Sequence, residues 1–90
     1  PKNRYLKKND NPPKVKIKFF ENLINTKNIN CYSNEGNVWR KSDIQFISKN
    51  ELVILLKEKF KSERGRINCS LWEEGGKWRW LGIQYVIAEY

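Results

Sequence analysis

Histidine is absent from this 90-residue chain, and cysteine occurs only twice. The lack of histidine removes the side chain that most often serves as a general acid or base at neutral pH. The chain also has no glycine-rich phosphate loop of the P-loop or dinucleotide-binding type. We therefore expect a protein that is not an enzyme and that carries no cofactor.

The two cysteines, Cys31 and Cys69, each end the tripeptide I-N-C. With no C-x-x-C pair and no histidine, a tetrahedral zinc site would lack ligands. We therefore expect two free thiols that are buried and act as small hydrophobic side chains. We expect no metal site.

No run of eighteen apolar residues is present, and no signal-type segment opens the chain. The sequence therefore predicts an intracellular protein of the cytoplasm, nucleoid or nucleus, with no membrane partner. Methionine is missing even at position 1, which suggests an excerpt of a longer chain or a processed product. The length suits a single domain with one modest core.

Positive charge is abundant: 18 Lys and Arg face 10 Asp and Glu, giving a formal net charge of +8. Such a charge attracts nucleic acid through the release of counterions, so nucleic acid is the expected partner, with no small-molecule ligand. The charge is concentrated in residues 1–18, where seven Lys and Arg side chains face one acid, Asp10. Residues 1–13, which end at Pro12-Pro13, are predicted to be a basic flexible tail or linker. Residues 14–90 would then form a single nucleic-acid-binding domain. The tail cations expected to contact phosphate are Lys2, Arg4, Lys7 and Lys8.

Two segments of the chain favour helices. Residues 14–25 alternate like a strand at first, but the apolar spacing that follows favours a helix from Val15 to Asn25. Ser48 and Glu51 form a capping-box pair that opens a helix over residues 49–61. The apolar stripe of that helix consists of Leu52, Val53, Leu55, Leu56 and Phe60. Between these segments, residues 29–41 are predicted to form a short polar hairpin or an irregular loop.

The run from Arg66 to Tyr85 is predicted to form a tryptophan-rich hairpin that turns at Glu74-Gly75-Gly76. With a loop of two or four residues, alternation places one apolar set on the core side. That set is Ile67, Cys69, Leu71, Trp78 and Trp80. The opposite, exposed side would carry Arg66, Asn68, Ser70, Trp72, Lys77 and Arg79.

The second half of the chain echoes the first. The run I-N-C-Y-S-N-E-G-N-V-W-R-K-S-D-I-Q-F is similar to I-N-C-S-L-W-E-E-G-G-K-W-R-W-L-G-I-Q-Y, 38 to 39 residues further on. Such an echo permits a fold in which a helix-plus-hairpin unit is used twice, with helices on one face of an antiparallel sheet.

The pieces S-K-N-E-L-V-I-L-L-K-E-K-F, S-E-R-G-R-I and K-W-R-W-L-G-I span about residues 48–85. Together they resemble the second half of winged-helix domains of the regulatory factor X type. Related domains stand at the C-termini of phage and poxvirus-type primase-helicases. The resemblance implies an α+β fold: a small winged-helix domain with two or three helices and a C-terminal Trp-rich β-hairpin. It also implies binding of duplex DNA, rather than RNA, in a replication or mobile-element protein.

In that reading, helix 49–61 is the recognition helix and residues 64–79 are the basic wing. The resemblance assigns groove contacts to Asn50, Lys57 and Lys61, and wing contacts to Arg64, Arg66, Lys77 and Arg79. Trp72, on the same side of the hairpin as the cations, could stack on an unpaired base.

Two other functions fit the same residues. One is a platform for single-stranded DNA or RNA, with Trp72 and Trp39 stacking on bases. The other is a protein-interaction or inhibitor module that binds an acidic partner surface, because Trp and Arg dominate interface hot spots.

Overall fold

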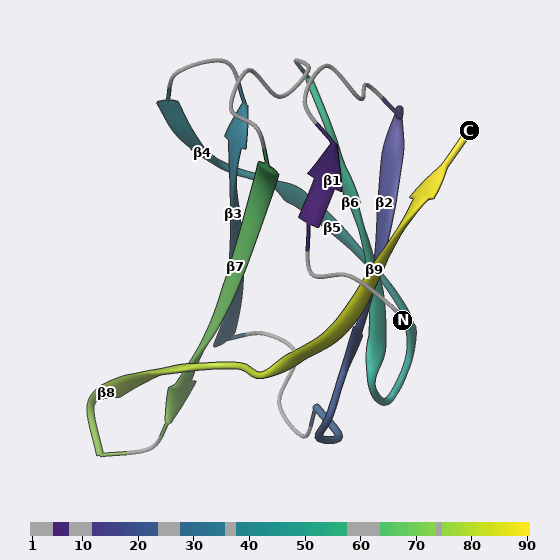
Figure 1. The fold of residues 1–90 in the computed structure, drawn as a ribbon. Helices are drawn as coiled ribbons and strands as arrows, with labels where there is room; N and C mark the ends of the chain where they lie inside the picture. The colour runs from purple at the N-terminus through teal and green to yellow at the C-terminus, as the bar shows by residue number, and fades with distance from the viewer. Residues whose placement is uncertain (1–4, 8–11, 24–27, 36–37, 58–63, 74) are drawn as a thin grey trace.

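The computed structural model describes residues 5–7, 12–23, 28–35, 38–57, 64–73 and 75–90, and these residues form nine β-strands (Figure 1). The described residues contain no α-helix, and so no helix long and apolar enough to cross a membrane. The expected α+β winged-helix fold is therefore wrong, as is the alternative with helices backing a sheet. The strands are β1 Tyr5–Lys7, β2 Lys14–Phe19, β3 Ile29–Glu35, β4 Val38–Lys41, β5 Asp43–Ser48, β6 Glu51–Leu55, β7 Arg64–Glu73, β8 Lys77–Trp80 and β9 Ile83–Glu89.

The strands make two antiparallel sheets. One has the order β1-β7-β3-β4, with β8 also pairing with β7, and the other has the order β5-β6-β2-β9. Since β3 and β8 both pair with Ser70 and Leu71, they must lie on opposite sides of β7. Buried residues of both sheets belong to one hydrophobic cluster. The domain is thus a β-sandwich with its core between the sheets.

Strand β2 replaces the helix predicted from Val15 to Asn25. Val15, Ile17 and Phe19 are fully buried, while the lysines between them point to the other side of the sheet. The period-2 alternation was therefore the correct signal, and the apolar pair at Phe19 and Phe20 misled because Phe20 is exposed. Burial on one face of a sheet decided the conformation. Residues 24–27 lie outside the described part.

The helix predicted over residues 49–61 is also wrong, because Glu51–Leu55 forms β6 and pairs with β5. Ser48 and Glu51 do interact: the Ser48 hydroxyl donates to Glu51 Oε1 over 3.1 Å and to Asn50 Oδ1 over 3.3 Å. The contact closes a hairpin turn with Lys49 and Asn50 at its tip, rather than capping a helix. The part of the predicted helix from residue 58 onward lies outside the described residues.

Of the two alternatives predicted for residues 29–41, a hairpin or an irregular loop, the hairpin is correct: β3 and β4 pair from Glu35–Val38 to Tyr32–Lys41. Strand β1 lies within the predicted tail. It pairs with β7, and Leu6 at its centre is buried in the core.

Cys31 and Cys69 form a disulfide, so the prediction of two free thiols is wrong. Both residues are fully buried and stand directly opposite each other on β3 and β7. The two I-N-C tripeptides therefore meet in the centre of one sheet. The chain has no other cysteine.

The echo between the two halves reappears in the connectivity. Strands β2 to β5 and strands β6 to β9 have equivalent pairings: β2 meets β6, β3 meets β7, and each half adds a hairpin partner at a sheet edge. The unit that recurs is four strands, without the helix that the sequence suggested.

Candidate recognition surface

The β7–β8 hairpin turns through three residues, 74–76, because Glu73 pairs with Lys77. Gly75 and Gly76 have φ angles of 102° and 86°, a region that residues with a side chain rarely adopt. The Gly76 amide donates to the Glu73 carbonyl over 3.2 Å and closes the turn.

This odd loop length reverses the predicted faces of β8. In an antiparallel pair, directly opposed residues point to the same side, and the register sets Trp78 opposite Trp72 and Trp80 opposite Ser70. All three tryptophans therefore share the outer face. Arg79 is opposite Leu71 and faces the other way. The prediction that Trp78 and Trp80 join the core, with Arg79 and Lys77 on the side of Trp72, is wrong.

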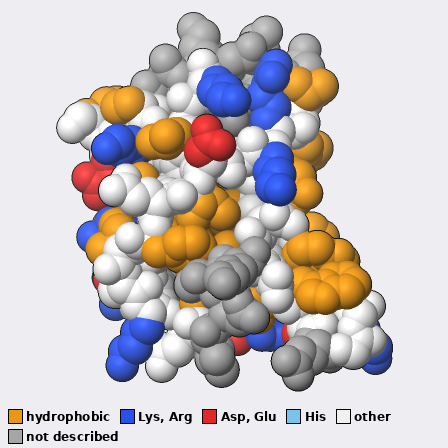
Figure 2. Space-filling model, turned by 180° about the vertical axis from the view of Figure 1, so that it is seen from behind, with side chains coloured by type: hydrophobic (Ala, Val, Ile, Leu, Met, Phe, Trp, Pro, Cys, Tyr) orange, Lys and Arg blue, Asp and Glu red, His pale blue; other side chains and the backbone are white. Residues whose placement is uncertain are grey.

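We call Trp72, Trp78 and Trp80 the tryptophan cluster. Their exposed fractions are 38%, 51% and 69%, so each indole presents a large surface to solvent. Trp72 and Trp78 meet edge to face, with ring centroids 5.2 Å apart and planes at 65°. Figure 2 shows hydrophobic side chains grouped at the surface beside the end of the molecule where this hairpin projects. The cluster is preformed by the two strands that carry it.

Arg79 lies on the underside of the hairpin and bridges two carboxylates. Its Nη1 and Nη2 donate to the two oxygens of Glu21 over 2.6 and 2.8 Å, and its Nε donates to Glu73. The hydrogen bonds from Arg79 lower the pKa of Glu21, while Glu21 and Glu73 raise the pKa of Arg79. Arg79 is therefore a compensated cation.

A polar strip continues from the tryptophan cluster across β7 and β3. It consists of Asn30, Tyr32, Asn34, Asn68 and Ser70. Asn30 stands opposite Ser70 and Tyr32 opposite Asn68, while the Arg66 amide donates to Asn34 Oδ1 over 2.8 Å.

The strip ends at the far edge of the sheet, on β4. There Trp39, which is 49% exposed, stands opposite Asn34. Three strand spacings separate β8 from β4, or about 14 Å across the sheet. Among the described residues, no acidic side chain occupies an outward position of β3, β4, β7 or β8.

The residues predicted to bind nucleic acid do not gather on one surface. Asn50 lies in the β5–β6 turn and Lys57 lies beyond the other end of β6, so the two flank opposite ends of a strand of the four-stranded sheet. Arg66 and Trp72 share the outer face of β7, whereas Lys77 and Arg79 point to its other side. Lys7 and Arg64 are paired in β1 and β7, and their side chains are outside the described part. Lys2, Arg4, Lys8 and Lys61 also lie outside it.

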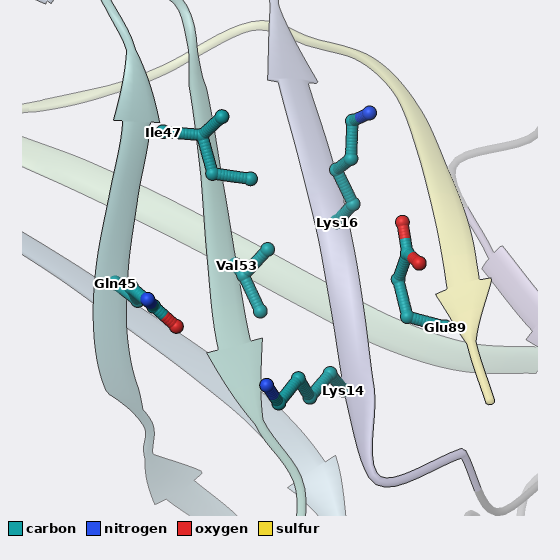
Figure 3. A pocket seen from close by; sticks show the side chains of 6 residues that line it. All are labelled: Lys14, Lys16, Gln45, Ile47, Val53 and Glu89. Atoms are coloured by element: carbon teal, nitrogen blue, oxygen red, sulfur yellow. The ribbon is translucent and has the colours of Figure 1, made fainter.

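The outer face of the four-stranded sheet carries a shallow pocket of about 260 Å³. Figure 3 shows the side chains that line it, from four strands: Lys14, Lys16, Gln45, Ile47, Val53 and Glu89. Lys16 lies 3.5 Å from the carboxylate of Glu51, and Lys14 is paired across strands with Glu89. Glu51 and Glu89 thus offset the positive charge of the lysines, and we interpret this face as an ordinary solvated surface with weak ion pairs.

The described residues contain no group of acids and cysteines arranged to hold a metal ion. No known protein family, curated protein or solved structure matches the chain. The tryptophan cluster, continued by the polar strip, is thus the candidate site that the geometry itself supplies. Sequence reasoning missed Trp78 and Trp80 as surface residues, and the Gly75-Gly76 pair was the signal that allows a three-residue loop.

Proposed function

We propose that this domain is a non-catalytic recognition module that binds a partner protein through the tryptophan cluster. The observation that carries the proposal is the exposure of three indoles on one face of a single hairpin. A large apolar patch left in water marks an interaction site more often than a packing defect. Tryptophan is also the residue most enriched where interfaces concentrate their binding energy.

The partner surface is proposed to be acidic around an apolar centre. The chain has a net charge of +8, and the described outward positions of β7 include Arg66, six residues along the strand from Trp72, but no acid. Charge complementarity of this kind speeds association and sets the orientation of docking. The indoles would supply the buried anchors and the cations the surrounding rim.

The disulfide supports a site of action in an oxidising compartment, in place of the intracellular location expected from the sequence. Structural disulfides persist in exported and extracellular proteins and are rare where glutathione keeps thiols reduced. The Cys31–Cys69 bond is fully buried in the core, where it joins the two central strands of a sheet. An exported partner protein fits this compartment better than a chromosome does.

The test compares the wild-type domain with the variants Trp80→Ser and Ile47→Ser. Trp80 is 69% exposed and Ile47 is 53% exposed, but they stand on different sheets, so Ile47→Ser is the matched control. The wild-type domain is cross-linked to proteins in the extracellular fraction of the cells that produce it, and the captured proteins are identified and purified. Each is then titrated by calorimetry against the wild-type domain and the two variants.

We expect a partner whose Kd weakens at least tenfold for Trp80→Ser and stays unchanged for Ile47→Ser, as for a hot-spot residue. In parallel, the domain is titrated with a single-stranded oligonucleotide at two salt concentrations. Salt-dependent binding of the oligonucleotide, lost in Trp80→Ser and unmatched by any protein, would overturn the proposal in favour of a base-stacking platform. Equal protein binding by all three domains would show that the cluster is not the site.

A further inference from the structure

We infer that Arg79 is a positioning residue of the recognition surface: it ties the underside of the β7–β8 hairpin to Glu21 and so fixes the tryptophan cluster against the body of the sandwich. The inference rests on the proposed function of the cluster. It assigns Arg79 a role different from the direct contact that the sequence suggested.

The tip of the hairpin overhangs the sheet. Pairing between β3 and β7 ends at Ile29 and Leu71, so the last residues of β7, Trp72 and Glu73, pair only with β8 within the described part of the chain. Strand β8 in turn pairs only with β7 there. Trp72 and Trp78 of the cluster therefore lie where the hairpin extends beyond β3, whereas Trp80 stands opposite Ser70, which still pairs with β3 (Figure 1).

Arg79 lies at the base of this overhang, opposite Leu71. Its two hydrogen bonds to Glu21 reach a residue that follows β2 in the other sheet, 58 positions away in the sequence. Its bond to Glu73 runs within the hairpin. One guanidinium thus joins Glu73, near the tip of the hairpin, to the segment that follows β2, and a bidentate geometry restricts direction as well as distance.

The same contacts argue against a direct role in binding. Three guanidinium nitrogens are engaged by carboxylates, and the side chain points away from the face that carries the indoles. A ligand on that face would reach Arg79 only after the bridge had broken. The positive charge of Arg79 is offset locally and adds little attraction for an acidic partner.

The test uses Arg79→Ala and Glu21→Ala, with Glu89→Ala as the control for removal of an exposed glutamate on the other sheet. Hydrogen exchange is measured at the Gly76 amide in the turn and at β2 amides in the core. We expect exchange at Gly76 to quicken about fivefold in the first two variants, because a well-formed exposed pair is worth about that factor. In these two variants, hydrogen exchange at the β2 amides should stay unchanged. In the control Glu89→Ala, exchange should stay unchanged both at Gly76 and in β2.

Partner binding then separates positioning from contact. If Arg79 positions the hairpin, both Arg79→Ala and Glu21→Ala weaken the Kd by a similar factor, since the hairpin must be ordered on binding. If Arg79 touches an acidic partner, Glu21→Ala instead frees the cation and leaves binding equal or tighter. That result, or unchanged exchange at Gly76, would overturn the inference. Failure of the proposed function would appear separately, as intact binding by Trp80→Ser.

Discussion

Removing the Cys31–Cys69 disulfide is expected to lower the free energy of unfolding by about 4 kcal/mol. The bond closes a loop with a sequence separation of 38 residues. Restricting a loop of that length in the unfolded chain contributes about 4 kcal/mol at 25 °C. A domain of this size has a total stability of about 5–13 kcal/mol, so the bond supplies a third or more of it. The melting temperature should fall by about 15–30 °C.

The assay is a thermal melt followed by tryptophan fluorescence and circular dichroism. Because both sulfurs are fully buried, the bond must be reduced in denaturant before the protein is refolded with reductant present. The double variant Cys31→Ala/Cys69→Ala serves as an independent route to the same state. A reduced protein that melts within about 3 °C of the oxidised one would refute the reasoning. So would the detection of two free thiols in the native protein by mass spectrometry after alkylation.

Three further expectations concern single side chains. Trp78→Ala should cost only about 0.5–1.5 kcal/mol in urea denaturation, the worth of its edge-to-face contact with Trp72, because the indole is half exposed; a loss above about 3 kcal/mol would mean that the indole is buried. Ile17→Ala, at a fully buried position, should cost about 2–5 kcal/mol in the same experiment, and a smaller loss would place Ile17 outside the core. The hydrogen bond from Arg79 lowers the pKa of Glu21 in the folded state, so the stability that this carboxylate contributes should be complete above its ordinary pKa of 4.5 and be lost as the pH falls through the lowered, folded-state pKa. Nuclear magnetic resonance titration of the carboxyl group checks this, and a midpoint above 4.5 would contradict it.

Sequence reasoning found hairpins more reliably than it found their faces. The tryptophan-rich hairpin is confirmed from Arg66 to Trp80, with its turn between Glu73 and Lys77, but the rest of the predicted run, from Ile83 onward, belongs to β9 in the other sheet. The hairpin of β3 and β4 is also confirmed. The side on which each tryptophan lies depends on whether the loop has an odd or an even number of residues. Two adjacent glycines permit either, so the sequence alone could not place Trp78 and Trp80.

The predicted helices failed for a different reason. The residues Leu52, Val53 and Ile54 are all buried, and a continuous apolar run of this length fits either a buried strand or a helix. Pairing with β2 and β5 decides between them, and that information lies elsewhere in the chain. The Ser48–Glu51 contact is equally compatible with a helix cap and with a hairpin turn.

The disulfide depended on topology in the same way. Nothing in the separation of Cys31 and Cys69 shows that their strands are neighbours. The repeated tripeptide was the useful hint, because the strands that carry its two copies, β3 and β7, are neighbours and set Cys31 opposite Cys69. The Arg79–Glu21 bridge lacked any such hint, since the two residues meet only through the packing of one sheet against the other.

The interleaving of the two halves means that neither half is a folding unit. Strands β2 and β6 lie side by side at the centre of one sheet, and β3 and β7 do so in the other. A cut in the turn at Lys49 would leave each polypeptide with only one paired hairpin, β3–β4 or β7–β8, among the described strands, yet the disulfide and both central strand pairs would still join the two pieces. The two halves of the chain are therefore joined in the way that the two subunits of an intertwined dimer are, through strand pairs shared between them. The two fragments, purified separately with their cysteines reduced and then mixed, should associate and form the same sandwich.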